Sequence, residues 1–290
     1  MKKIMNPRLM LLVSMVIFGT IGLFKRYVPV SSEELALYRA IMGAVLLGAV
    51  LLVTRRPIPL RELKKEALLL LLSGAAMGVN WILLFKAYDN TSISLATLSY
   101  YFAPVLVTLA CPILFRETMS VKQIICFVMS TVGIVLIVGT AGSGRGNDLV
   151  GIAYGLGAAV LYATVVLLNK YIKNVQGLHR TFLQFAAAVT VLVPYVLLTK
   201  GITLGGLERS GWINLLIVGV LHTGLAYCLY FSSLKELPGQ EAAVLSYVDP
   251  LVAVIISSCI ETPLTPAQWL GGALILGFAV WNEIAPKQTK

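Results

Sequence analysis

The chain has 290 residues, of which 58% are hydrophobic and only 12% charged, and its mean hydropathy is +0.87. Soluble domains carry about a quarter charged residues, so this composition excludes a water-soluble globular protein and predicts an all-α or β-barrel protein of the lipid bilayer. The net charge of +10 comes from basic residues scattered near the ends of apolar runs, which indicates lipid headgroups as partners and no nucleic acid.

Ten apolar stretches of roughly spanning length follow one another along the chain. Each is long and continuous rather than alternating with a period of two residues, which favours helices over the strands of a barrel. The fold class is therefore predicted as all-α integral membrane, with ten transmembrane helices over residues 9–27, 35–53, 67–88, 94–115, 121–140, 149–172, 180–199, 211–234, 240–260 and 267–284.

Basic residues near the ends of these helices fall mainly on one side of the membrane. With the N-terminus inside, sixteen Lys and Arg residues lie on the cytoplasmic side. Because cytoplasmic loops collect Lys and Arg, we expect a multi-pass protein of the cell (plasma) membrane with both termini in the cytoplasm. The opposite side holds six basic residues, namely Lys25, Arg26, Lys86, Arg145, Lys200 and Arg209.

The second five stretches repeat landmarks of the first five in the same order. Since each copy has an odd number of crossings, the two copies must lie in the bilayer with opposite orientations, as in inverted-repeat transporters. We expect a first repeat over residues 1–141, a Gly-rich linker over 142–148 and a second repeat over 149–290. Matched pairs, at offsets of 144 to 146 residues, include Phe18 and Tyr162, Gly74 and Gly219, Tyr101 and Tyr247, and Pro104 and Pro250.

Short motifs distributed along both halves give the chain a resemblance to a known family. They are Ile17-Phe18-Gly19 in the first helix, Arg39 early in the second, Pro104 and Pro250 in the fourth and ninth, and Glu117 and Glu261 in the loops before the fifth and tenth. In these residues the chain resembles the EamA family of the drug/metabolite transporter superfamily over essentially its whole length. The resemblance implies a ten-helix transporter with a central cavity and alternating access, and it names no cargo. Family-wide substrate rules are not carried over, because Ala163 and Gln184 depart from the pattern set by Gly19 and Arg39.

Pro104 and Pro250 lie near the middle of their predicted helices. A proline inside a helix lacks an N–H donor and displaces the carbonyl four residues earlier, which here frees the carbonyls of Tyr100 and Ser246. In hydrocarbon such carbonyls must face protein, water or substrate. The two prolines therefore predict helix kinks that either line a cavity or are satisfied by a neighbouring Ser or Thr.

Three ionisable side chains that lie at least one turn inside predicted membrane helices are candidate site residues. Asp249 lies near the middle of the ninth, where a carboxylate costs roughly 2.5 to 3.5 kcal/mol; it carries a coupling proton or binds a substrate amine, unless it forms a buried pair that fixes helix packing. His222, near the centre of the eighth, is a second candidate for proton coupling and substrate binding, or a hydrogen-bonded core residue. Arg39 binds a substrate carboxylate or snorkels to the headgroups.

Aromatic and amide side chains at intermediate depth complete the predicted substrate site, which adds Asn80, Trp81, Tyr100, Tyr101, Tyr227 and Tyr247. Such a pocket suits a small organic ligand, and its ring faces also attract an ammonium group. Tyr27, Tyr171 and Trp212 are excluded because they lie near helix ends, where interfacial aromatic belts form. Small residues spaced by four, such as those starting at Gly74 and Gly151, suit internal packing or the seam of a homodimer, and a ten-helix bundle favours internal packing.

The sequence contains none of the enzyme motifs HExxH, GxSxG or a Walker-type loop, so we expect no catalytic residue, no metal and no cofactor. The hypothesis is a secondary carrier of a small polar or zwitterionic metabolite, an amino acid or related amine, that exchanges between inward-open and outward-open states under a proton or solute gradient. The alternatives are an uncoupled metabolite exporter and a choline-like quaternary-amine importer. A non-transporting membrane scaffold, an alternative of another class, would not need Asp249 and His222 at mid-membrane.

Overall fold

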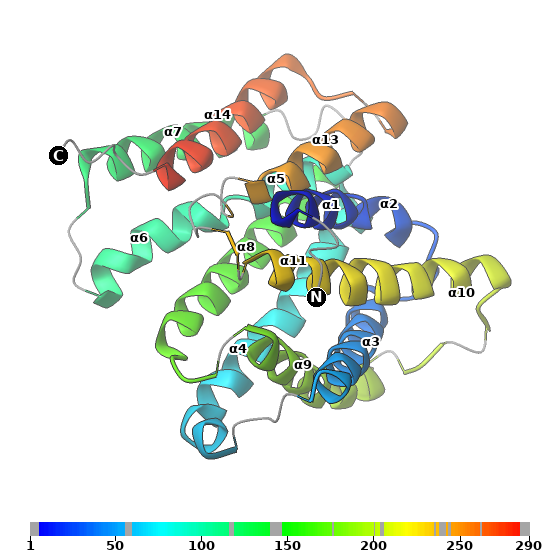
Figure 1. Cartoon of the computed structure of the whole chain (residues 1–290). Coiled ribbons are helices and arrows are strands. Elements are labelled where there is room, and N and C mark those ends of the chain that lie inside the picture. The colour runs from blue at the N-terminus through cyan, green and yellow to red at the C-terminus, as the bar shows by residue number, and fades with distance from the viewer. Residues whose placement is uncertain are drawn as a thin grey trace.

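The computed structural model describes residues 6–55, 60–115, 119–139, 147–175, 177–199, 201–203, 206–234, 236–237, 242, 245–261 and 263–284. These residues form helices and turns, with no strand among them (Figure 1). Within them, seven helical segments are long and apolar enough to cross a membrane, and Val121–Ile137 and Val248–Ile260 are shorter apolar helices. The prediction of an all-α membrane protein is confirmed, whereas the number of ten crossings stays a prediction.

Large apolar side chains cover the outside of the bundle. Leu52, Ile113 and Leu198 are 80%, 81% and 86% exposed, and each lies in a helix. A soluble protein rarely exposes so much contiguous apolar surface, whereas a bilayer solvates it without cost. The outer surface is therefore suited to lipid, and polar groups must gather inside the bundle.

The helices of the first half follow the predicted stretches. Capping side chains start several of them: Ser31 forms a capping box with Glu34, and the Ser92 hydroxyl accepts the Leu95 N–H at 3.2 Å. The first and fourth stretches are each broken into two helices. In chain order the helices are α1 (Pro7–Gly19), α2 (Ile21–Lys25), α3 (Ser32–Val53), α4 (Leu60–Asn90), α5 (Ile93–Tyr100), α6 (Ala103–Phe115) and α7 (Val121–Gly139).

The second half follows its predicted stretches as well, with one unexpected segment. The eighth stretch contains a nine-residue π-helix between two α-helices. Residues 142–146 of the predicted linker lie outside the described residues. The helices are α8 (Asp148–Tyr171), α9 (Gly177–Thr199), α10 (Arg209–Leu216), η2 (Ile217–Leu225, the π-helix), α11 (Ala226–Leu234), α13 (Val248–Ile260) and α14 (Pro266–Glu283).

Contacts between helix ends show the direction in which each half runs. Lys25, at the end of α2, pairs with Asp89 near the end of α4, and the Thr91 hydroxyl donates to Asp148, the first residue of α8, at 2.7 Å. The first stretch therefore ends where the sixth begins. Likewise Glu261, directly after α13, accepts the N–H of Ile93 at the start of α5 at 2.8 Å. Matched stretches of the two halves thus run in opposite directions.

The helices of each half pack mainly against those of the other half. α4 packs on α8, and the matching pair is α1 on α11. α4 also packs on α9, and the matching pair is α3 on η2. The corresponding helices α3 and α9 pack on each other as well. α7 and α14, the last helices of the two halves, lie side by side (Figure 1). When each helix is replaced by its counterpart in the other half, the same set of helix pairs results. The repeats therefore form one interlocked bundle with an approximate two-fold relation.

Small residues allow the closest of these contacts. A Cβ atom on Gly74 of α4 would lie 2.4 Å from the Gln184 carbonyl oxygen of α9, and one on Gly155 of α8 would lie 2.8 Å from the Ser99 Cβ of α5. Two helices approach this closely only where one of them lacks a side chain. Both glycines therefore serve packing inside the bundle, while a homodimer stays an untested expectation.

Candidate functional site

A cavity of about 430 Å³ lies between the two halves of the bundle. Its walls come from α1, α2, α3, α4, α5, α6, α8, α11, α13 and α14, so neither repeat forms it alone. Eight of the nine predicted substrate-binding residues line it, namely Arg39, Asn80, Trp81, Tyr100, Tyr101, Tyr227, Tyr247 and Asp249. Pro104 lines it too, whereas His222 and Pro250 do not.

The two prolines follow breaks in the helices rather than kinks in continuous ones. α5 ends at Tyr100 and α6 begins at Ala103, so Pro104 is the second residue of a new helix, while Pro250 is the third residue of α13. A proline is tolerated in the first turn of a helix, where its missing N–H has no partner to lose. The turn before each proline directs Tyr101 and Tyr247 into the cavity, where their ring centroids are 6.0 Å apart.

Asp249 lies in the first turn of α13 and borders the cavity. The positive end of the helix dipole favours a carboxylate at this position. The Tyr101 hydroxyl donates a hydrogen bond to its Oδ2 atom at 2.6 Å, which joins the two halves of the chain. Among the described residues no Lys or Arg forms an ion pair with Asp249, so this carboxylate is available to a cationic group in the cavity.

Arg39 provides the opposite charge. Its side chain is 5% exposed, so it does not snorkel to the membrane surface. The guanidinium carbon lies 4.5 Å from the centre of the Trp81 ring, a cation–π contact, and Nε donates to the Thr223 hydroxyl at 3.1 Å. Within the described part of the chain no carboxylate pairs with Arg39. The cavity therefore contains one cation and one anion that do not neutralise each other directly.

Aromatic rings form much of the cavity wall beside these two charges. Tyr100 lies 5.8 Å from Tyr101 and 5.5 Å from Tyr162, measured between ring centroids. Asn80 is 1% exposed and donates its amide to the Ala158 carbonyl at 2.6 Å, so its donor group holds α4 to α8. The rings leave room for the apolar part of a small organic molecule, and Asn80 contributes to the wall mainly through packing.

His222 lies outside the cavity and is fully buried. Its Nε2 atom is 2.8 Å from the Thr20 hydroxyl, and its Nδ1 atom is 3.2 Å from the Ile217 carbonyl oxygen. Both ring nitrogens therefore have protein partners, and the ring packs edge-on against Phe24 at 5.1 Å. This placement matches the alternative of a hydrogen-bonded core residue and gives no route to a substrate.

Other cavity residues were not predicted as site residues. Tyr88, Tyr162, Tyr230 and Glu283 all line the cavity. The internal repeat contained a signal for Tyr162, because it matches Phe18 of the first half and both residues face the cavity. The three aromatic residues assigned to interfacial belts do not line the cavity, and their side chains are exposed: Tyr27 by 60%, Tyr171 by 45% and Trp212 by 41%.

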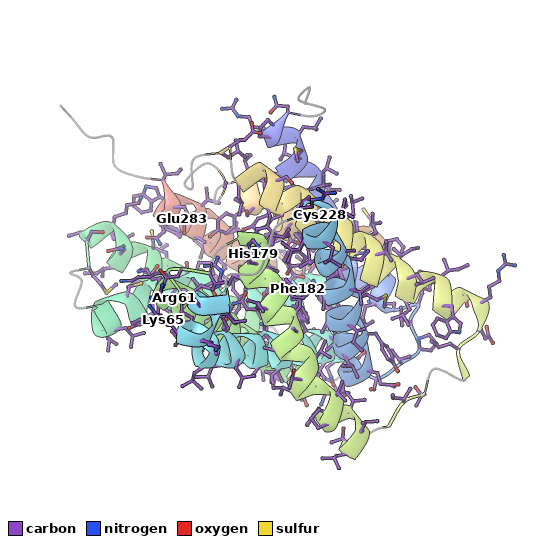
Figure 2. All side chains as sticks on the ribbon, turned by 60° about the horizontal axis from the view of Figure 1, so that its bottom comes forward. Arg61, Lys65, His179, Phe182, Cys228 and Glu283 are labelled. Atoms are coloured by element: carbon purple, nitrogen blue, oxygen red, sulfur yellow. The ribbon has the colours of Figure 1, made fainter. Side chains whose placement is uncertain are left out.

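Three ion pairs join helix ends next to one end of the cavity. Lys25 pairs with Asp89, Arg26 pairs with Glu261, and Lys86 pairs with Glu33 at 2.8 Å. We call these six residues the charged layer. It lies directly beyond the cavity wall, because Tyr88 lines the cavity and Asp89 belongs to the layer. At the other end the lining reaches Glu283, the last residue of α14, and Figure 2 shows Glu283 at the end of that helix.

Sequence comparisons agree with this arrangement. The profile of the EamA-like transporter family matches residues 6–139 and 149–282, once in each half. A protein of Bacillus subtilis (strain 168) named "Uncharacterized transporter YxxF" is 32% identical over 271 residues, which cover 93% of this chain and 86% of the relative. An "Uncharacterized transporter" of Archaeoglobus fulgidus is 26% identical over 278 residues, covering 94% and 95% of the two chains.

A solved crystal structure has the same fold. It superposes with a TM-score of 0.62 over 94% of each chain at 17% sequence identity. The family profile matches both halves of the chain, and the relatives are named as transporters rather than enzymes. The chain therefore belongs to the EamA-like transporter family and is a multi-pass membrane transporter.

Proposed function

We propose that the protein is a secondary carrier of a small zwitterionic metabolite, an amino acid or a related amine. The observation that carries the proposal is that Arg39 and Asp249 line one cavity without forming an ion pair with each other. Two unneutralised opposite charges inside a membrane protein are costly, and a ligand with both charges would neutralise them. Arg39 binds the carboxylate, since a guanidinium pairs with it through two parallel hydrogen bonds. Asp249 binds the amine or carries a coupling proton.

The cavity alternates its access between the two sides of the membrane. We infer that the charged layer closes one end, while the lining reaches Glu283 at the other. Figure 2 shows Arg61 and Lys65, at the start of α4, on the same side of the bundle as Glu283. Because basic residues collect on the cytoplasmic side, we assign this end to the cytoplasm of a plasma-membrane protein. Both termini then lie there, and the ten stretches form two inverted repeats, over residues 1–141 and 149–290.

Two other transport functions remain as candidates. An uncoupled metabolite exporter would use the same cavity and would be insensitive to an imposed pH gradient. A choline-like quaternary-amine importer would depend on the tyrosine faces and on Asp249, since rings and a carboxylate both attract an ammonium group. The buried Arg39 disfavours the second function, because a permanent cation gives its guanidinium no partner. A scaffold without transport would gain nothing from either charge.

Binding of purified protein to matched ligands tests the proposal. Each amino acid of a panel is compared with its decarboxylated amine and its N-acetyl derivative, with choline as a further ligand, and binding is read as thermal stabilisation. The amino acid should bind best. Loss of one charged hydrogen bond costs about 1.5–3 kcal/mol, so each derivative should bind roughly 10- to 150-fold more weakly.

Two variants test which charged group of the ligand each of the two residues binds. Arg39→Gln should abolish the preference for the amino acid over the amine, and Asp249→Asn should abolish the preference over the N-acetyl derivative. Arg209→Gln and Glu208→Gln, which change exposed residues outside the cavity, are the matched controls. Equal binding of all three ligand types to the unmodified protein would refute the zwitterion assignment. Counterflow of the best ligand in proteoliposomes then tests transport itself.

A further inference from the structure

The π-helix η2 does not line the substrate cavity, but it contacts Arg39, which does. Thr223 lies in η2, is fully buried and does not line the cavity. Its hydroxyl accepts the hydrogen bond from Arg39 Nε, and Arg39 does line the cavity. The hydrogen bond to Arg39 therefore links Thr223 to the cavity, although Thr223 itself touches no ligand.

The π-helical winding sets the direction of this hydrogen bond. The Thr223 hydroxyl donates its one proton to the carbonyl oxygen of Val218, five residues earlier, at 3.0 Å. The same five-residue spacing defines the π-helix and places His222 Nδ1 beside the Ile217 carbonyl. With its proton committed, the hydroxyl offers only lone pairs to its other neighbour. Thr223 is thus fixed as an acceptor for Arg39 Nε–H.

Close packing holds the two residues together. Gly43 lies one turn after Arg39 on α3, and a Cβ atom there would be 2.7 Å from Thr223 Cγ2 and 2.3 Å from Phe185. A side chain at position 43 would therefore collide with Thr223, so α3 and η2 are closely packed at this level. Side-chain rotation at Thr223 is restricted further because a β-branched residue has few allowed rotamers.

These contacts leave one edge of the guanidinium unused. Its face lies on Trp81 and its Nε is bound to Thr223, while the two Nη groups have no hydrogen-bond partner among the described residues. The Nη groups of a guanidinium form the fork that binds a carboxylate with two parallel hydrogen bonds. A guanidinium that is free to rotate would present this fork only part of the time.

We propose that Thr223 is a positioning residue that orients Arg39 so that its Nη edge faces the cavity, and thereby sets the preference of the carrier for ligands with a carboxylate. The proposal rests on the proposed function in that it assigns the carboxylate of the ligand to Arg39. It adds that the selectivity depends on a residue that touches no ligand.

Three variants test the role of Thr223. Thr223→Val has nearly the same shape but no hydroxyl, and Thr223→Ser keeps the hydroxyl. Thr164→Val is the matched control, because the Thr164 hydroxyl donates to the Val160 carbonyl at 2.9 Å and the residue does not line the cavity. Ligand selectivity is measured as the ratio of the affinities for an amino acid and for its decarboxylated amine.

Thr223→Val should reduce this ratio about tenfold by weakening amino-acid binding, with amine binding unchanged, while Thr223→Ser and Thr164→Val should keep the ratio of the unmodified protein. If Thr223 had a purely structural role, Thr223→Val would weaken the binding of both ligands equally. An equal loss for both ligands, or an unchanged ratio, would overturn the proposal.

A second measurement does not depend on transport or on the true substrate. In protein labelled with ¹⁵N-arginine, the Nε–H signal of Arg39, assigned with Arg39→Lys, should exchange slowly with water and should shift on addition of acetate. Thr223→Val should make the exchange faster and abolish the acetate shift. An unchanged exchange rate in Thr223→Val, or no acetate shift in the unmodified protein, would refute the positioning role. If no amino acid is transported but the acetate shift is present and depends on Thr223, the proposed function fails while the positioning role stands.

Discussion

The ion pair between Arg26 and Glu261 should control access to the cavity from the end that the charged layer closes. The Glu261 side chain is 1% exposed and that of Arg26 is 29% exposed. Besides pairing with Arg26, Glu261 accepts the Ile93 N–H at 2.8 Å and a hydrogen bond from the Ser257 hydroxyl. Glu261 thus joins the end of α2 to α5 and α13, and its replacement by Gln removes the charge while keeping an oxygen acceptor for Ile93.

The size of the effect follows from these exposures. Removal of one partner of a buried ion pair costs about 3–5 kcal/mol, because the other charge stays buried and unpaired. Arg26 is partly exposed and can regain water, and the Gln oxygen can still accept from Ile93, so we expect about 1–3 kcal/mol here. This loss falls only on the conformation in which the layer is closed. The equilibrium should therefore shift about 5- to 150-fold towards opening at the charged layer.

Accessibility of a cysteine at position 21 measures this shift. Ile21 lines the cavity one turn before Lys25. Ile21→Cys is introduced after replacement of Cys111, Cys126, Cys228 and Cys259. A membrane-impermeant maleimide, added on the side of the charged layer, should label it faster in Glu261→Gln than in the unmodified background.

Two comparisons decide whether the ion pair is responsible. Glu208→Gln, which removes an exposed carboxylate outside the layer, should leave the labelling rate unchanged. In a double-mutant cycle, Arg26→Gln combined with Glu261→Gln should have no larger effect than Glu261→Gln alone, because Glu261→Gln by itself already breaks the pair. Labelling in Glu261→Gln at the rate of the control, or additive effects in the cycle, would refute the gating role.

Three further predictions concern single residues. Asp249→Asn should reach the membrane at normal levels but lose concentrative transport in proteoliposomes, and unchanged uptake would remove Asp249 from the mechanism. Gly74→Ala should lower the Tm in detergent, because its Cβ would lie 2.4 Å from the Gln184 carbonyl oxygen; Gly139→Ala, with open space around it, is the control, and equal Tm values would contradict the packing role. His222→Ala should also lower the Tm, while the pH dependence of transport stays unchanged; an altered pH profile would return His222 to the proton pathway.

The amino-acid sequence predicted the helices well because the signals for them are local. Each of the ten apolar stretches coincides with one or more helices. A run of apolar residues in lipid has to pair its own backbone, and helices do so within one segment. Capping residues such as Ser31, Ser92 and Thr265 mark helix starts for the same local reason. The breaks before Pro104 and Pro250 follow from the missing proline N–H.

Most of the candidate site was predicted from the sequence for a related reason. A polar or ionisable side chain in a long apolar helix is costly in lipid, so it faces the interior of the bundle. This argument predicted interior positions for Arg39, Asp249 and the tyrosines, and these residues line the cavity. It could not separate His222 from them, because cavity and core are both interior, and only the positions of Thr20 and Ile217 decide between the two.

By itself, the sequence determined that this protein is a membrane bundle of two matched halves whose interior contains opposite charges. The tertiary structure decided which charged and polar side chains meet. Lys25 and Asp89, Arg26 and Glu261, and Arg39 and Thr223 come from different helices, and they pair because of how the two halves interlock. The π-helical turn at Thr223 likewise left no local signal. Hydropathy and capping act between near neighbours in the chain, whereas helix rotation and pairing are set by packing between distant segments.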